Sequence, residues 1–205
     1  MAVMSRIEQA FCRSVLWRTL SRRLVVPWII QDHALYGEVL ELGTGSGAMA
    51  KELLERYPIR TLVATDVDPL MVIAAERRLA SHVPHVQVRR ADATSLPFED
   101  GQFDAVVSFL MLHHVLDWEQ ALRESLRVLR PGGLLLGYDL TNTIPARIVH
   151  RLDGSPHRLA TPDEMRATLE STGMQDISVS PGLAGLVMRF VVSNAHTTAK
   201  NDDIS

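Results

Sequence analysis

The chain has 205 residues, of which 46% are hydrophobic and 22% are charged, which is ordinary for a globular domain. Its formal net charge of -3 gives no general attraction to nucleic acid. The single cysteine, Cys12, excludes an intramolecular disulfide and fits a reducing compartment. The apolar run at 24–30 is interrupted by Pro27 and is too short to span a bilayer. We therefore expect a cytoplasmic protein with no stable membrane insertion and no nucleic-acid partner.

The first part of the chain predicts an amphipathic helix over residues 4–24. Apolar side chains recur there at helical spacing, and arginines lie between them. A helix that caps the core, a lid over a substrate site and an anchor on a membrane surface all have this pattern. We expect residues 1–36 to form a helical cap or lid, residues 37–193 to form the core and residues 194–205 to be a disordered tail.

Strands and helices alternate through the rest of the chain. The predicted elements are strands at 38–42, 61–65, 86–89, 103–109 and 134–138, with helices at 48–57, 69–81 and 118–129. Thr161 and Glu164 have capping-box spacing and begin another helix. The last two strands, 175–180 and 186–192, are too close in sequence for a crossover, so one of them must be antiparallel. This alternation predicts an α/β fold with a mostly parallel sheet and helices on both faces.

A glycine-rich turn follows the first strand of the core. Residues 41–47 are Glu-Leu-Gly-Thr-Gly-Ser-Gly, and a helix begins directly after them. Glycine lets a ligand approach the backbone closely, and it adopts positive φ at little cost. Gly43, Gly45 and Ala48 also satisfy the dinucleotide fingerprint, so the turn alone leaves the ligand open.

Five motifs in the same order resemble the class I S-adenosylmethionine-dependent methyltransferases. Residues 41–47 are similar to the first motif of that family, and Asp66 ends the second strand, where the family has its ribose-binding acid. Residues 92–98, 103–108 and 129–133 are similar to the adenine-contacting motif, the fourth-strand motif and the turn before the fifth strand. The closest subgroup is the ubiquinone/menaquinone-biosynthesis type (methyltransferase type 11). The resemblance implies a Rossmann-like, seven-stranded sheet with an antiparallel final hairpin.

The resemblance also implies the cofactor S-adenosylmethionine, with S-adenosylhomocysteine as its product. The residues implied to bind the cofactor are Glu41, Gly43, Thr44, Gly45, Gly47, Asp66, Val67, Asp92, Ala93 and Ser108. The carboxylate of Glu41 would lie near the amino group of the methionyl part, and Asp66 would accept both ribose hydroxyls. A dehydrogenase would use an acid at the position of Asp66 as well, and Asp92 could instead cap a turn.

Residues after the fourth strand are candidates for acceptor binding and catalysis. His113 and His114 follow this strand at the edge where open α/β sheets bind ligands. Packing, contact with the acceptor and general-base catalysis are all open for these histidines. We expect Phe109, Met111 and His113 to line the acceptor site. Members of the subgroup carry metal-supporting acids here, but this chain has Leu110 and His113 in those positions, so we expect no metal.

The segment from 139 to 160 is predicted to be a connecting loop. Its charged and titratable side chains are either solvated or contact a polar or anionic acceptor; they are Arg147, His150, Arg151, His157 and Arg158.

The sequence predicts methyl transfer to a small, largely apolar or aromatic acceptor, by a monomer or homodimer. A catalytically inactive methyltransferase-like binding protein and a nicotinamide-dependent oxidoreductase are the alternatives. A nucleic-acid or protein methyltransferase would normally need a basic groove or an acceptor-specific motif.

Overall fold

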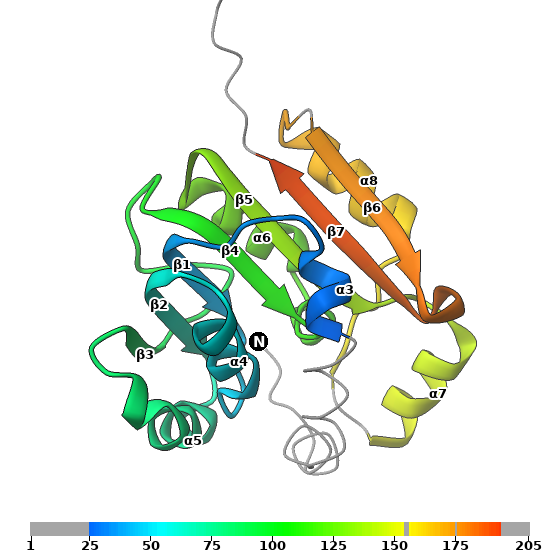
Figure 1. Cartoon of the computed structure of the whole chain (residues 1–205). Coiled ribbons are helices and arrows are strands. Elements are labelled where there is room, and N and C mark those ends of the chain that lie inside the picture. The colour runs from blue at the N-terminus through cyan, green and yellow to red at the C-terminus, as the bar shows by residue number, and fades with distance from the viewer. Residues whose placement is uncertain (1–24, 154–155, 175, 194–205) are drawn as a thin grey trace, which may run out of the picture.

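The centre of the molecule is one seven-stranded sheet (Figure 1). A computed structural model describes residues 25–153, 156–174 and 176–193, so the predicted helix at 4–24 and the predicted tail at 194–205 lie outside the described residues. The strands are β1 (Gly37–Leu42), β2 (Ile59–Asp66), β3 (Val86–Arg90), β4 (Phe103–Phe109), β5 (Leu129–Leu140), β6 (Asp176–Gly182) and β7 (Val187–Ser193). Their order is β3-β2-β1-β4-β5-β7-β6, and only β7 pairs antiparallel with its neighbours. The predicted fold class is confirmed.

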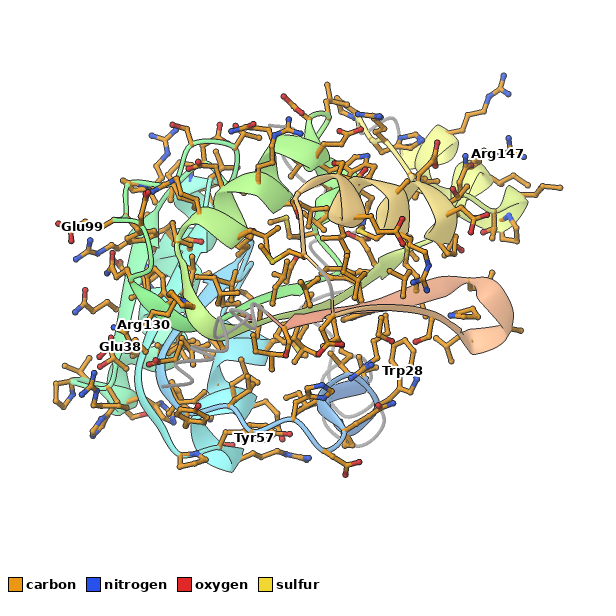
Figure 2. The ribbon with its side chains drawn as sticks, turned by 90° about the horizontal axis from the view of Figure 1, so that it is seen from above. Trp28, Glu38, Tyr57, Glu99, Arg130 and Arg147 are labelled. Atoms are coloured by element: carbon orange, nitrogen blue, oxygen red, sulfur yellow. The ribbon has the colours of Figure 1, made fainter. Side chains whose placement is uncertain are left out.

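Helices cover both faces of this sheet, as Figure 2 shows. The described helices are α3 (Val26–Ile30), α4 (Ala48–Arg56), α5 (Pro69–Leu79), α6 (Trp118–Arg127), α7 (Ile144–Asp153) and α8 (Pro162–Ser171), with short 3-10 turns η2 (Ala80–His82), η3 (Leu112–His114) and η4 (Leu183–Gly185). One buried apolar cluster joins α3, α4 and α5 to the sheet, and a second joins α6 and α8 to the opposite face. Neighbouring residues such as Val39 and Leu40 belong to different clusters, because successive side chains of a strand point to opposite faces.

Local signals begin two of these helices where the sequence places them. Asp68 accepts a hydrogen bond from the N–H of Leu70 at 2.8 Å, and Pro69 follows it in the first turn of α5. At α8, the N–H of Glu164 donates to Thr161 Oγ1 at 3.2 Å, and the N–H of Thr161 donates back to Glu164 Oε2 at 2.7 Å. The capping box predicted from the sequence is therefore confirmed.

The boundaries between α6 and β5 differ from the prediction. The helix ends at Arg127, and β5 covers Leu129–Leu140 rather than 134–138 alone. The Pro-Gly-Gly turn at 131–133 lies inside the strand, where the register against β4 shifts between Phe103 and Ala105. Because the irregularity is confined to this shift, the turn does not end the pairing.

Two helices were missed by the sequence analysis. The prediction of a connecting loop over 139–160 is wrong, because α7 occupies Ile144–Asp153. Its residues Ile144 and Ile148 are exposed, whereas a periodic apolar pattern detects helices that bury one face. The short α3 was also missed, although Pro27 lies in its first turn, where proline is tolerated. No helix in the described ranges combines the length and apolar character needed to cross a bilayer.

A buried arginine holds α3 against the sheet. Arg189 of β7 is 4% exposed, and its Nε donates to the carbonyl of Ile29 at 2.6 Å. Burial lowers the pKa of Arg189. This bond satisfies a carbonyl at the end of α3 that the helix itself leaves unpaired.

We predict that Gly137→Ala destabilises the fold more than Gly132→Ala does. A Cβ at Gly137 would overlap the carbonyl oxygen of Ser108 and the ring of Phe190, whereas a Cβ at Gly132 meets no atom within 4 Å. Gly132 has φ +79°, so its substitution costs about 1 kcal/mol through backbone strain alone. Overpacking at Gly137 should cost about 2–3 kcal/mol in the free energy of unfolding. Urea unfolding of both variants checks this, and equal losses would contradict it.

Candidate functional site

The glycine turn after β1 leaves open space at only one of its three glycines. Gly43, Gly45 and Gly47 all have positive φ, at 61°, 55° and 75°. A Cβ on Gly43 would lie 2.6 Å from Met111 Cγ, and one on Gly47 would lie 3.1 Å from the Cα of Ala75. A Cβ on Gly45 meets nothing within 4 Å. Gly43 and Gly47 are therefore required for packing, while Gly45 exposes the backbone to a ligand.

Asp66 joins this turn to the end of β2. Its Oδ2 accepts from the N–H of Gly45 at 2.8 Å, and its Oδ1 accepts from the N–H of Asp68 at 2.9 Å. Burial raises the pKa of Asp66, and the two backbone donors oppose that rise. Each carboxylate oxygen has two lone pairs, so these bonds leave acceptor capacity for hydroxyl groups of a ligand.

Glu41 lies beneath the turn and is 1% exposed. Its Oε2 accepts from Thr44 Oγ1 at 2.6 Å. Burial raises the pKa of Glu41 to about 7; the bond from Thr44 opposes this rise, and the negative charge of Asp66 adds to it. A buried carboxyl group of this kind is ready to take a cationic partner, since a positive charge nearby would restore its ionised form.

Asp92 forms its own turn next to the end of β2. Its Oδ1 accepts from the N–H of Thr94 at 2.8 Å and from Thr94 Oγ1 at 2.7 Å. The turn-capping role that the sequence left open is thus present at this oxygen. The turn is held beside β2 because Arg90 Nε donates to the carbonyl of Val67 at 3.0 Å. Ala93 is buried in this turn.

The residues at the end of β4 are more buried than an open binding surface would be. The ring of Phe109 packs 6.2 Å from that of Tyr138, and Met111 lies against Gly43. Ser108 is 1% exposed, and its Oγ has no hydrogen-bond partner among the residues that the structure describes. Leu110 has φ +54°, a conformation that costs a leucine energy and that clusters at functional sites.

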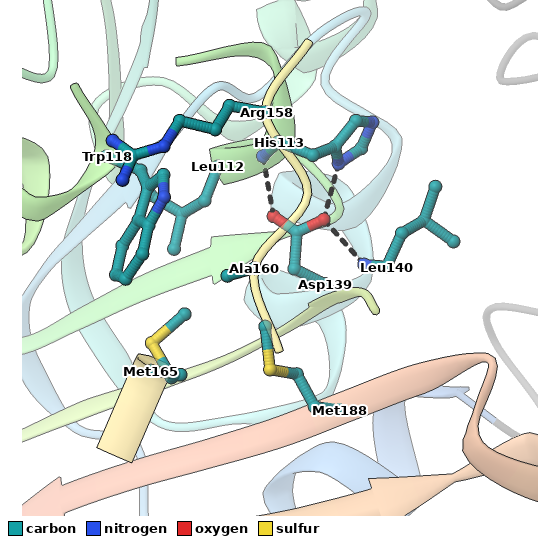
Figure 3. A pocket seen from close by; sticks show the side chains of 9 residues that line it. All are labelled: Leu112, His113, Trp118, Asp139, Leu140, Arg158, Ala160, Met165 and Met188. Carbon is teal, nitrogen blue, oxygen red and sulfur yellow. Dashed lines mark hydrogen bonds and ion pairs between the residues drawn. The ribbon is translucent and has the colours of Figure 1, made fainter. Parts of the chain in front are cut away.

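His113 forms a buried pair with Asp139, a residue that the sequence analysis did not select. His113 Nδ1 is hydrogen-bonded to Asp139 Oδ1, and the N–H of His113 donates to Asp139 Oδ2 at 3.1 Å (Figure 3). The N–H of Leu140 also donates to Oδ1, at 2.6 Å. Both side chains are less than 5% exposed. Asp139 lies near the carboxyl end of β5. Open α/β sheets bind ligands at the carboxyl ends of their strands, so this rule selects Asp139 as well as the residues after β4.

The second histidine and a small pocket flank this pair. The ring of His114 lies 4.1 Å from that of His113, and His114 is buried. Figure 3 shows apolar side chains on the other side of Asp139, including Leu112, Met165 and Met188. This pocket has room for no more than about one water molecule, so it is too small to hold an acceptor. Within the described ranges, no cluster of three or more histidine, cysteine, aspartate or glutamate side chains could hold a metal.

A family model described as a methyltransferase domain matches residues 40–137. This range contains the glycine turn, Asp66, the turn at Asp92 and His113. A demethylmenaquinone methyltransferase from Thermus thermophilus is 42% identical over 98 residues, which are 48% of this chain and 44% of that protein. These matches support a class I S-adenosylmethionine-dependent methyltransferase domain over residues 40–137.

Solved structures of methyltransferases share the whole fold. A Haloferax volcanii methyltransferase in complex with the activator Trm112 superimposes with a TM-score of 0.76 at 18% identity, over 95% of this chain and 100% of that chain. A phosphoethanolamine N-methyltransferase from Haemonchus contortus, in complex with S-adenosyl-L-methionine, has a TM-score of 0.72 at 15% identity, over 86% of this chain and 52% of that chain. The chain spans about half the length of the curated relatives it matches.

These matches bear out the predicted family resemblance and the predicted cofactor, S-adenosylmethionine, and they favour a methyltransferase over the nicotinamide-dependent oxidoreductase. The residues of this site fit the cofactor. Gly45 leaves room for close backbone approach, Glu41 is a buried acid with no cation beside it among the contacts described, and Asp66 keeps acceptor capacity. The individual residue roles remain predictions.

We predict that Gly45→Ala weakens cofactor binding by about tenfold or more, because its Cβ would enter the open space beside the turn. Gly132→Ala is the matched control. Gly132 also has a positive φ and open surroundings, but it lies at the opposite end of the parallel strands. Calorimetric titration with S-adenosylhomocysteine, with NADH as a ligand that should not bind, checks this. Equal weakening in both variants would show that the effect comes from general strain.

We predict that Glu41→Gln removes a pH-dependent loss of stability. The pKa of Glu41 is raised from 4.5 to about 7 in the folded state, so between these values the folded state keeps a proton that the unfolded state has released. Stability therefore falls as pH rises through this window, by about 3 kcal/mol in total. Glutamine does not titrate, so the stability of the variant relative to wild type should rise by about this amount from pH 4.5 to pH 8. Chemical unfolding across this range measures it, and parallel curves for the two proteins would refute it.

Proposed function

We propose that this chain transfers a methyl group from S-adenosylmethionine to a small, largely apolar or aromatic acceptor that must lose a proton to react. The observation that carries this proposal is the meeting of two groups at one edge of the sheet. The glycine turn with Glu41 and Asp66 follows β1 and β2, and the His113–Asp139 pair follows β4 and β5. Met111 packs against Gly43 and connects the two groups.

The cofactor would be held by the residues that the sequence predicted. Glu41, with Thr44 against it, faces the amino group; Gly43, Gly45 and Gly47 form the backbone turn; and Asp66 binds the ribose. Val67, Asp92 and Ala93 surround the adenine, and the orphaned hydroxyl of Ser108 supplies a further polar contact. When bound, S-adenosylmethionine supplies a methyl group activated by its positive sulfonium. The protein then has to align the nucleophile with that methyl group and exclude water.

His113 would act as the general base, with Asp139 as its positioning residue. Asp139 accepts hydrogen bonds from two backbone N–H groups as well as from the imidazole. Because an ionised carboxylate only accepts, Nδ1 of His113 carries a proton and the lone pair lies on Nε2. Nε2 would hold the proton that the acceptor loses when it is methylated, and Asp139 would stabilise the resulting imidazolium. His114, stacked on His113, helps to fix the plane of that ring.

The buried residues around this base support an apolar acceptor. Phe109 and Met111 are less than 10% exposed, so a strongly charged acceptor would lose its hydration beside them. The relative from Thermus thermophilus is named for methylation of demethylmenaquinone. We propose an acceptor of this class for the present chain, in the reduced form, because only a reduced quinone has hydroxyl groups that can lose a proton. A monomer or homodimer in the cytoplasm without a bound metal remains part of the proposal.

We predict that Asp139→Asn lowers kcat by about tenfold to a hundredfold on a reduced naphthoquinone acceptor. Asparagine keeps the size of the side chain but supplies no charge for the imidazolium. His113→Gln should lower kcat at least as much, because it removes the proposed base. Asp117→Asn is the matched control, because Asp117 only caps α6, and asparagine caps a helix equally well.

Calorimetry with S-adenosylhomocysteine separates the possible failures. Binding without turnover on any reduced quinone would favour the catalytically inactive binding protein. Turnover that is unchanged in Asp139→Asn would remove the proposed base and leave the methyl transfer in place.

A further inference from the structure

Helix α7 and the turn between β6 and β7 form one end of the molecule. The N–H of Thr141, which precedes α7, donates to the carbonyl of Leu186 at 3.0 Å. The hydroxyl of Thr141 is hydrogen-bonded to the carbonyl of Gly185. Figures 1 and 2 show α7 and this turn at the same end. We call this end the α7 surface.

Large apolar side chains are exposed together on the α7 surface. Ile144 and Ile148 of α7 are 65% and 53% exposed, and Leu183 and Leu186 of the turn are 69% and 41% exposed. Single exposed apolar residues are normal, but a group of aliphatic residues on one surface marks an interaction site.

The turn that carries Leu183 has a strained backbone. Leu183 and Ala184 have φ of 47° and 54°, and Gly185 after them also has positive φ. A left-handed conformation is unfavourable for residues with a Cβ, and such strain is frequent at functional sites. Strain and an exposed leucine thus occur in the same turn.

The cations of the α7 surface have no partner among the residues that the structure describes. Arg147 and Arg151 of α7 are exposed, and the structure shows no side-chain hydrogen bond or ion pair for either with a described residue. Elsewhere in the described ranges, Arg77 is the one other arginine of this kind. The rest pair with carboxylates, as Arg60, Arg127, Arg130 and Arg158 do, or donate to other oxygens.

We propose that the α7 surface docks on a lipid bilayer that carries anionic headgroups. The exposed aliphatic side chains suit the boundary of the acyl chains, and the two unpartnered arginines suit the headgroup phosphates. A second copy would bring like charges together across a two-fold contact. The N-terminal 24 residues contain five arginines and one glutamate, so their net charge has the same sign as that of the two arginines. An anionic bilayer matches both the apolar and the charged part of the surface.

The position of the α7 surface connects it with the site. Only the residues from 140 to 143 separate Asp139 from the start of α7. A protein docked by α7 therefore holds the carboxyl edge of its sheet near the lipid, where an apolar acceptor is dissolved. This use of the surface rests on the proposed function, whereas the docking itself does not.

Sedimentation with lipid vesicles tests the docking on the full chain. We expect wild type to bind vesicles of phosphatidylglycerol and phosphatidylcholine at least about tenfold more strongly than vesicles of phosphatidylcholine alone. The double variant Arg147→Glu/Arg151→Glu should lose this preference. The double variant Ile148→Ser/Leu183→Ser should reduce binding to both kinds of vesicle.

Helix α5 supplies matched controls at the other end of the molecule (Figure 1). Arg77→Glu and Ile73→Ser change an exposed arginine and an exposed isoleucine there, and both should leave vesicle binding unchanged. No binding by wild type, or equal losses in the α5 variants, would overturn the proposal. The proposal would also be overturned if wild type bound no vesicles but self-associated, and the serine substitutions abolished that self-association.

Calorimetry with S-adenosylhomocysteine on the same variants keeps the two proposals apart. Unchanged affinity shows that each variant is folded. If neither wild type nor any variant binds this ligand while the vesicle results are as expected, the proposed function fails and the docking stands.

Discussion

The fold depends on the central position of β1 between two parallel neighbours. β1 is hydrogen-bonded to β2 on one side and to β4 on the other, and parallel strands end at the same edge of a sheet. The glycine turn, Asp66 and the segment with His113 come from three separate parts of the chain, and this pairing brings them to one edge. The hydrogen bond from Gly45 to Asp66 and the packing of Met111 against Gly43 then fix their spacing.

Ionisable groups are buried at this edge. Their burial costs the folded state free energy, but methyl transfer can use such groups. Glu41 is held in a dry site where burial raises its pKa to about 7, and His113 and Asp139 are sealed between strands and the 3-10 turn η3. Each buried group retains hydrogen bonds that satisfy part of its polar capacity. Under the proposed function, cofactor affinity and proton transfer would depend on groups whose burial contributes little to the stability of the folded state.

The α7 surface differs from this edge of the sheet in what it buries and exposes. There the chain exposes apolar side chains instead of burying polar ones, and its two arginines lack the partners that all other arginines of the described ranges except Arg77 have. The polar edge and the apolar end are joined by the few residues between β5 and α7. A structure of this kind suits a protein that binds a charged, water-soluble cofactor and takes its acceptor from a less polar phase.

The sequence by itself determined the order of the core elements and the residues of the glycine turn. These depend on local signals such as strand periodicity, positive-φ glycines and the capping box at Thr161, which act over a few residues. The tertiary structure alone decided that Asp139 pairs with His113, because the two residues are 26 positions apart in the sequence and meet only through strand pairing. It also decided that Gly45 faces open space while Gly43 and Gly47 face side chains. Helix α7 escaped prediction for a related reason: Ile144 and Ile148 are exposed, and a sequence pattern does not tell where a side chain points until the neighbouring elements are in place.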